Sequence, residues 1–183
     1  MKKKTAKSII LCTAIVALNS ACGNKEKTDN SDSGGATGPS ISSSLIAETA
    51  PEGALGVVAA RAAAKPGEAI VLRGKVGGKM NPISDSAAIF VLADENAIAS
   101  CDQNPDDECE TPWDYCCEEA STIAASTATI QFRGEDGKIL RSTLRGVGDL
   151  KELSFLVVSG TVDSASTAEA LIVNADKIHV EKP

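Results

Sequence analysis

Four cysteines lie within 17 residues in the second half of this 183-residue chain. They are Cys101, Cys109, Cys116 and Cys117. Thiols at this density form either disulfides or a metal site. In an exported protein, an even number of cysteines predicts two disulfides, in which the adjacent Cys116 and Cys117 each bond to one of the earlier cysteines. The spacing leaves two such connectivities open.

A thiolate site for zinc or copper is the alternative for the same cysteines. Their spacing is Cys-x7-Cys-x6-Cys-Cys, which lacks the Cys-x2-Cys pair typical of structural zinc. Two adjacent cysteines also strain tetrahedral coordination. A redox couple is disfavoured because no Cys-x-x-Cys is present.

The same segment is strongly acidic. From Asp94 to Glu119 there are ten carboxylates and no Lys or Arg. Four of them are candidate calcium ligands: Asp102, Asp106, Asp107 and Glu108. The order departs from an EF-hand loop, because Asp107 stands where Gly is needed and Trp113 where the bidentate Glu belongs. A solvated acidic loop without an ion is the simpler interpretation.

The segment also holds the only Trp and the only Tyr of the chain. Trp113, Asp114 and Tyr115 are candidate partner-binding residues, although packing of the two rings over the disulfides and one mouth of a barrel is the simpler interpretation. The phrase Thr-Pro-Trp-Asp-Tyr-Cys-Cys-Glu, residues 111–118, resembles a motif of uncharacterised exported bacterial proteins with an OB-fold-like domain. That resemblance implies a fold and an exported location but no activity, so none is assigned.

Composition excludes several functions. The formal net charge of -7 makes nucleic acid an unlikely partner, and 3% aromatic residues cannot build a stacking platform. The single His, His179, excludes a multi-histidine metal site and leaves little for a Ser-His-Asp hydrolase. We therefore expect neither an enzyme nor an organic cofactor, and we expect a monomer.

Short apolar runs predict a mainly β domain over residues 45–183, with the acidic cysteine-rich segment 95–122 as an insertion. An Ala-rich stretch at 54–64 predicts a leading helix that ends before Pro66. Strands are expected at 68–78, 88–94, 127–133, 138–145, 155–163 and 171–180, a short helical turn at 149–153, and a bulge near Asp176. Basic residues are expected on outward strand positions, paired with carboxylates of the insertion: Arg73, Lys75, Arg133, Arg141 and Arg145.

Five or six short strands with little helix predict a small barrel. Three phrases, at 71–76, 155–162 and 171–178, resemble strands of an OB-fold, and the resemblance covers about residues 66–180. An immunoglobulin-like sandwich is the alternative, but it gives no reason for the leading helix.

The N-terminus predicts export. A basic start is followed by an apolar stretch of 11 residues, Ser8 to Leu18, which is too short to span a bilayer comfortably. Small residues then precede Cys22, so residues 1–21 resemble a lipoprotein signal peptide with Cys22 as the lipidated residue. Residues 22–44 form a polar, flexible linker. This layout predicts a lipid anchor at the periplasmic face of a bacterial membrane, most simply the outer one.

Two functions are consistent with these observations. The first is a lipid-anchored periplasmic binding or structural module that acts through its acidic cysteine-rich loop, with an envelope protein as a candidate partner. The alternative is a protein that binds a metal cation, either calcium or zinc or copper.

Overall fold

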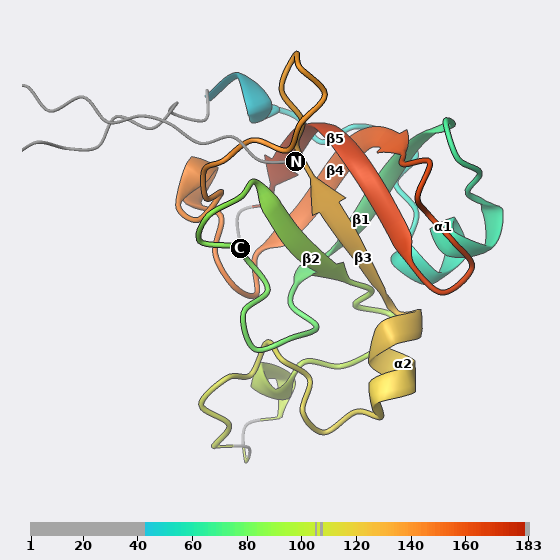
Figure 1. Cartoon of the computed structure of the whole chain (residues 1–183). Helices are drawn as coiled ribbons and strands as arrows, with labels where there is room; N and C mark the ends of the chain where they lie inside the picture. Colours follow the sequence, from blue (N-terminus) through green and yellow to red (C-terminus); the bar gives the residue numbers. More distant parts are fainter. Residues whose placement is uncertain (1–42, 105, 107, 182–183) are drawn as a thin grey trace, which may run out of the picture. The chain divides into compact units, whose positions relative to one another are not determined.

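The computed structural model describes residues 43–104, 106 and 108–181 (Figure 1). The predicted signal peptide, Cys22 and nearly all of the predicted linker lie outside the described residues. The strands are β1 (Ala69–Val76), β2 (Ile89–Ala93), β3 (Thr127–Gln131), β4 (Phe155–Val162) and β5 (Leu171–Val180). The helices are η1 (Ser43–Leu45), α1 (Val57–Ala63), η2 (Cys101–Gln103), α2 (Ala120–Ala125) and η3 (Val147–Asp149).

The five strands form one closed barrel in the order β1-β2-β3-β5-β4. Every neighbouring pair is antiparallel except β3 and β5, which are parallel. Closure leaves no strand edge open along the barrel, which is how a small antiparallel sheet avoids pairing with other chains. The single closed sheet rules out the two-sheet sandwich that the sequence left as an alternative.

Apolar side chains that alternate along the strands fill the interior of the barrel. In β1, Ile70, Leu72 and Val76 are buried, as their shared face predicted. Helix α1 closes one side with Val57 and Ala60, which belong to the same core. A carboxylate from the end of β2 caps this helix: Asp94 Oδ2 accepts the Val58 N–H at 2.9 Å.

Most of the predicted elements are confirmed. The leading helix and five strands are present, with ends that differ from the predicted ones by a few residues. The bulge is also confirmed, because Ser159 pairs with Lys177 while Gly160 pairs with Ala175, which leaves Asp176 without an opposite residue. A Cβ on Gly160 would lie 2.3 Å from the Asn174 carbonyl oxygen, so this close approach requires glycine.

Three local predictions are wrong. Residues 138–145 form no strand; they make a single bridge between Ile139 and Arg133, after which the Thr143 hydroxyl donates to the Ser84 carbonyl. The expected turn at 149–153 is a 3-10 helix displaced toward the N-terminus, η3. Helix α2, in the predicted loop, was missed because its six residues carry no capping signal.

No helix in the described part of the chain combines the length and the apolar character needed to cross a bilayer.

Candidate metal centre

The insertion between β2 and β3 docks onto the end of β1 through its Trp-Asp-Tyr phrase, at one end of the barrel (Figure 1). The Gly78 N–H donates to the Trp113 carbonyl at 2.8 Å. A Cβ on Gly77 would lie 2.6 Å from that same oxygen and 2.7 Å from the ring of Tyr115. Glycine at this position therefore lets the insertion approach the barrel backbone.

Tyr115 is the anchor of the insertion. Its side chain is fully buried, and it forms a small second core with Ala93 and Ile98, against which Ile123 of α2 packs. Burial also raises the pKa of the Tyr115 phenol to about 12. This position favours the packing interpretation of Tyr115 over direct contact with a partner. Trp113 is half-buried, and its indole N–H donates to the Met80 carbonyl at 2.9 Å.

Three cysteine sulfurs converge beside this anchor. Cys101 is buried at the start of η2, and its N–H donates to the Pro112 carbonyl, which joins the two halves of the insertion. The Cys101 and Cys116 Sγ atoms lie 3.9 Å apart, and those of Cys109 and Cys116 lie 3.6 Å apart. A disulfide requires about 2.05 Å, and no S–S bond joins the cysteines of the described residues. The predicted disulfides are thus not seen, although their sulfurs are neighbours.

The Asp114 carboxylate lies beside the three thiols. This carboxylate and the sulfurs of Cys101, Cys109 and Cys116 all lie within 4.8 Å of one another. Its two oxygens are held in place: Oδ2 accepts from the Thr111 hydroxyl at 2.8 Å, and Oδ1 accepts the Cys116 N–H at 2.9 Å. The sequence indicated Asp114 only as a candidate partner-binding residue. The signal that could have identified it is its position two residues before Cys116, which is the spacing of an Asx turn.

The thiols affect one another. Burial raises the pKa of the Cys101 thiol. Hydrogen bonds with the thiols of Cys109 and Cys101 raise the pKa of Cys116, which is itself exposed. Cys117 also interacts with Cys101. In the absence of a metal the raised pKa values favour the protonated thiols of Cys101 and Cys116, and a metal ion would have to displace these protons.

The four groups fit a tetrahedral ion. With metal–sulfur bonds of about 2.3 Å, tetrahedral geometry places neighbouring sulfurs about 3.8 Å apart. The two measured separations, 3.6 and 3.9 Å, lie on either side of this value. A carboxylate oxygen bonded at about 2.1 Å would lie about 3.6 Å from each sulfur. The four ligand atoms lie within 4.8 Å of one another, which is about 1 Å more than these ideal separations. Binding of an ion by all four groups therefore requires shifts of about 1 Å.

The candidate calcium ligands are not brought together in the same way. The one cluster of metal-ligating groups among the described residues contains none of Asp102, Asp106 and Glu108. Asp106 and Glu108 are exposed, and Asp107 lies outside the described residues.

Asp102 has a different partner, a buried lysine. The Lys75 ammonium donates to Ser100 Oγ at 2.8 Å and to both oxygens of Asp102 at 3.1 Å. Lys75 is 4% exposed and lies 5.1 Å from the centre of the Phe155 ring. The sequence predicted a lysine on an outward position that pairs with the insertion. The pairing is present, but the insertion covers the lysine. Strand alternation cannot show that a distant loop will fold over the outward face.

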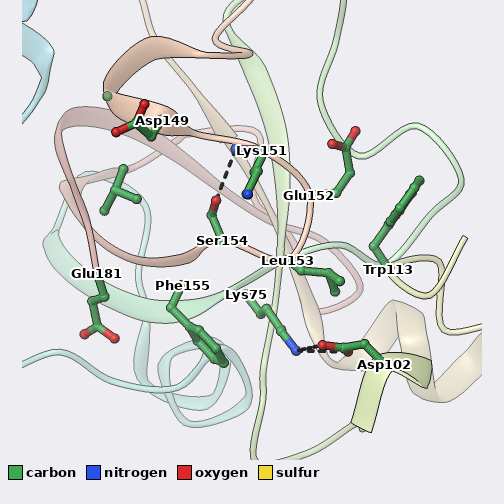
Figure 2. Close-up of a pocket in the computed structure, with 12 residues that line it drawn as sticks. Lys75, Asp102, Trp113, Asp149, Lys151, Glu152, Leu153, Ser154, Phe155 and Glu181 are labelled. Carbon is green, nitrogen blue, oxygen red and sulfur yellow. Dashed lines mark hydrogen bonds and ion pairs between the residues drawn. The ribbon is translucent and has the colours of Figure 1, made fainter. Parts of the chain in front are cut away.

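Lys75 and Asp102 also line a pocket of about 770 Å³ (Figure 2). Trp113 and Leu153 contribute apolar walls, and the 148–154 loop forms one side. The loop is held against β1 because the Leu153 N–H donates to the Val76 carbonyl at 2.9 Å. The pocket is therefore adjacent to the thiol cluster, since Asp102 follows Cys101 and Trp113 precedes Asp114.

The other basic residues that the sequence predicted to pair with the insertion differ in their partners. Arg73 pairs with Glu95 of the insertion and with Glu181, which lies 2.8 Å away. Arg145 pairs with Glu152 at 2.5 Å, which is not in the insertion. Pairing with the insertion is therefore confirmed only for the two residues of β1, Arg73 and Lys75.

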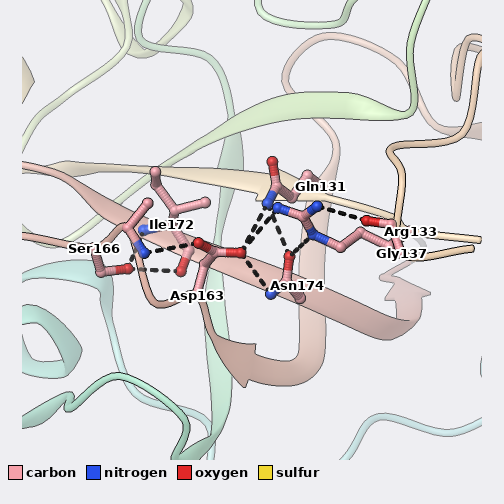
Figure 3. A network of polar contacts seen from close by, with 8 residues as sticks. Gln131, Arg133, Gly137, Asp163, Ser166, Ile172 and Asn174 are labelled. Carbon is pink, nitrogen blue, oxygen red and sulfur yellow. Dashed lines mark hydrogen bonds and ion pairs between the residues drawn. The ribbon is translucent and has the colours of Figure 1, made fainter.

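Arg133 belongs to a separate polar network on the barrel (Figure 3). Its guanidinium donates to Asp163 Oδ2 at 3.0 Å, which also accepts from Asn174 Nδ2 at 2.7 Å. A hydrogen bond from the Ala165 N–H, and then those from Asn174 and Arg133, hold the pKa of Asp163 below its ordinary value. Gln131 completes the set by donating to Asn174 at 2.8 Å. Each group has a partner, so we assign the network to stability.

No family model, no curated protein and no solved structure matches this chain.

Proposed function

We propose that the chain binds one divalent metal ion in its acidic insertion, through Cys101, Cys109, Cys116 and Asp114. The observation that carries this proposal is the convergence of three sulfurs and one oriented carboxylate within 4.8 Å. The sulfur separations of 3.6 and 3.9 Å suit a tetrahedral ion. This is the alternative function that the sequence left open, with Asp114 added as a ligand.

The donor set favours zinc over calcium. Thiolates select soft or borderline ions, whereas calcium takes six to eight oxygen ligands. Three thiolates and a carboxylate carry a charge of -4, which a divalent ion reduces to -2 and a monovalent copper ion only to -3. Besides Asp114, the segment from Asp94 to Glu119 contains nine carboxylates and no Lys or Arg, so the less negative complex is favoured.

A site with four protein ligands is closed, which is typical of structural rather than catalytic zinc. The described insertion has only two short helical elements, η2 and α2, and the small core at its base contains only three buried residues, of which Ala93 belongs to β2. A metal bonded to both halves of the insertion would therefore supply much of its stability. It would also fix Asp102 and Trp113, which line the adjacent pocket.

We further propose that the barrel is an OB-fold and that the chain is a lipoprotein anchored through Cys22 at the periplasmic face of a bacterial membrane. The strand order β1-β2-β3-β5-β4 in a closed five-stranded barrel supports the first part. The basic, apolar and small-residue pattern before Cys22 supports the second. Globomycin-sensitive processing and labelling with a palmitate analogue would test the anchor, with Cys22→Ser as the control.

The metal proposal is tested with the full chain, purified under reducing conditions and dialysed against Zn²⁺. Elemental analysis and native mass spectrometry should give one zinc ion per chain. Replacement by Co²⁺ should give the thiolate-to-metal charge-transfer absorption of a cysteine-rich site. A chain that keeps its fold by circular dichroism but retains no zinc would refute the proposal.

Matched variants test the ligands. Cys116→Ser and Asp114→Asn should each weaken zinc binding by at least about tenfold, because each removes one of four ligands. Asp106→Asn changes an exposed carboxylate outside the cluster and should have no effect. If Cys117→Ser weakens binding while Asp114→Asn does not, then Cys117 is the fourth ligand.

The second candidate function is a binding or structural module for an envelope protein, which the sequence placed first. The pocket beside Trp113, with its apolar walls, favours it. Photo-crosslinking from position 113 in intact cells would test it. A specific crosslink that is absent from a chain lacking residues 95–122 would support it, and absence of any crosslink would count against it.

A further inference from the structure

We propose that the metal site is redox-controlled: oxidation joins Cys109 and Cys116 in a disulfide and expels the metal ion. This inference rests on the proposed metal function and names the regulation of the same site. It also connects the two chemistries, disulfide and metal, that the cysteine spacing left as alternatives.

The geometry selects the pair. Cys116 is the shared neighbour, 3.6 Å from Cys109 and 3.9 Å from Cys101 by sulfur separation. It can form a disulfide with only one of them, and Cys109 is the closer. Cys116 is exposed and Cys109 half-buried, so an oxidant in solution reaches this pair, whereas Cys101 is 5% exposed. A small closure of the loop between Cys109 and Cys116 brings their sulfurs to bonding distance.

The oxidant is a peroxide, and the reaction takes two steps. Cys116 gives up its thiol proton when the metal binds, so its sulfur reacts as a thiolate. This sulfur attacks one oxygen of hydrogen peroxide and the O–O bond breaks, so that Cys116 becomes a sulfenic acid and the departing hydroxide takes a proton to form water. The Cys109 thiolate then attacks the Cys116 sulfur, the S–S bond forms and the S–O bond breaks, and the second hydroxide is protonated to water.

The balance is two thiolates, one hydrogen peroxide and two protons giving one disulfide and two waters. Two electrons pass from the sulfurs to the peroxide oxygens, and the metal ion keeps its charge. The ion loses two of its four ligands and leaves with water in their place. A dithiol reductant reverses the reaction by disulfide exchange, after which the site can bind metal again.

The remaining thiols follow from this pairing. A bond between Cys109 and Cys116, whose sulfurs are 3.6 Å apart, leaves Cys101 and Cys117 as the two remaining thiols of the insertion. A second equivalent of oxidant would join these two. Of the two connectivities that avoid a bond between adjacent cysteines, the structure thus favours Cys109–Cys116 with Cys101–Cys117.

The test uses the full chain loaded with Zn²⁺ and titrated with hydrogen peroxide. A chromogenic chelator measures zinc release, and peptide mapping without reduction identifies the disulfides. We expect one zinc ion released for each Cys109–Cys116 bond formed, and zinc binding restored by dithiothreitol and fresh Zn²⁺. Cys117→Ser retains the reacting pair and should release zinc with the same stoichiometry. In Cys109→Ser, Cys116 should form no disulfide with another cysteine at the first equivalent of peroxide.

Three results would overturn the inference. These are zinc release accompanied by a Cys101–Cys116 bond, zinc release accompanied only by sulfinic acid, and zinc retention at peroxide concentrations that oxidise the metal-free chain. A reduced chain that never binds zinc would refute the proposed function itself, and the inference with it. The first three outcomes leave the metal function intact, so the two failures are distinguishable.

Discussion

The pair formed by Lys75 and Asp102 holds the insertion to the barrel, and its two halves should respond very differently to mutation. The Lys75 side chain is 5% exposed and that of Asp102 is 35% exposed. Removing Asp102 leaves a buried ammonium with Ser100 as its only remaining hydrogen-bond partner among the described residues. Removing Lys75 leaves a carboxylate that water can still reach.

These exposed fractions determine how much each substitution should lower the free energy of unfolding. Breaking a buried ion pair by deleting one partner costs about 3–5 kcal/mol. Because a third of Asp102 is in contact with solvent, we discount this and expect Asp102→Ala to lower the free energy of unfolding by about 2–3 kcal/mol. Lys75→Met keeps the apolar stem against Phe155 and removes the charge, so its cost should stay within about 1 kcal/mol. The double variant should be more stable than Asp102→Ala alone.

Urea unfolding of the reduced, metal-free chain measures all four proteins. Far-ultraviolet circular dichroism follows the barrel, and fluorescence of Trp113, the only Trp, follows the insertion. The order expected from the most to the least stable is the unmodified chain, Lys75→Met, the double variant and Asp102→Ala. If Lys75→Met proves as destabilising as Asp102→Ala, or the double variant is less stable than both single variants, the reasoning from desolvation is refuted.

Two further predictions concern the barrel. Gly160→Ala should lower stability by about 2–3 kcal/mol, because its Cβ would lie 2.3 Å from the Asn174 carbonyl oxygen in β5, which cannot move without breaking the ladder; thermal unfolding measures it. The lowered pKa of Asp163 makes this carboxylate stabilising above its unfolded pKa of about 3.9, and its contribution is lost as the pH falls through the lower folded value. Asp163→Asn should therefore reduce the acid dependence of the unfolding free energy, as measured by urea titrations between pH 5 and pH 2.

Each of these has a matched control. Gly134→Ala places its Cβ 3.2 Å from the end of the flexible Leu140 side chain, so its cost should stay within about 1 kcal/mol. Asp85→Asn changes a carboxylate whose side chain is 90% exposed, and it should leave the acid dependence unchanged. Equal effects in a variant and its control would contradict the structural explanation.

Strand alternation and glycine positions determined most of the barrel in advance. In β1 the apolar side chains of Ile70, Leu72 and Val76 lie on one face of the strand, so the strand and its inward face could be assigned without knowing its neighbours. The shift of the apolar pattern in β5 likewise located the bulge at Asp176. These signals are local, because each reports how one strand faces one core.

The candidate metal centre depended on contacts that no local pattern records. The cysteines and the excess of acids marked the insertion as the chemically distinct segment, but sequence could not decide which side chains would meet. Tertiary contacts determine three features of this site: the approach of the insertion to Gly77, the burial of Tyr115, and the hydrogen bond between the Asp114 carboxylate and the Cys116 N–H. These contacts are not encoded locally, because a segment with few apolar residues takes its conformation from the surface of the barrel that it packs against. For the same reason Lys75, outward on its own strand, is buried in the folded protein.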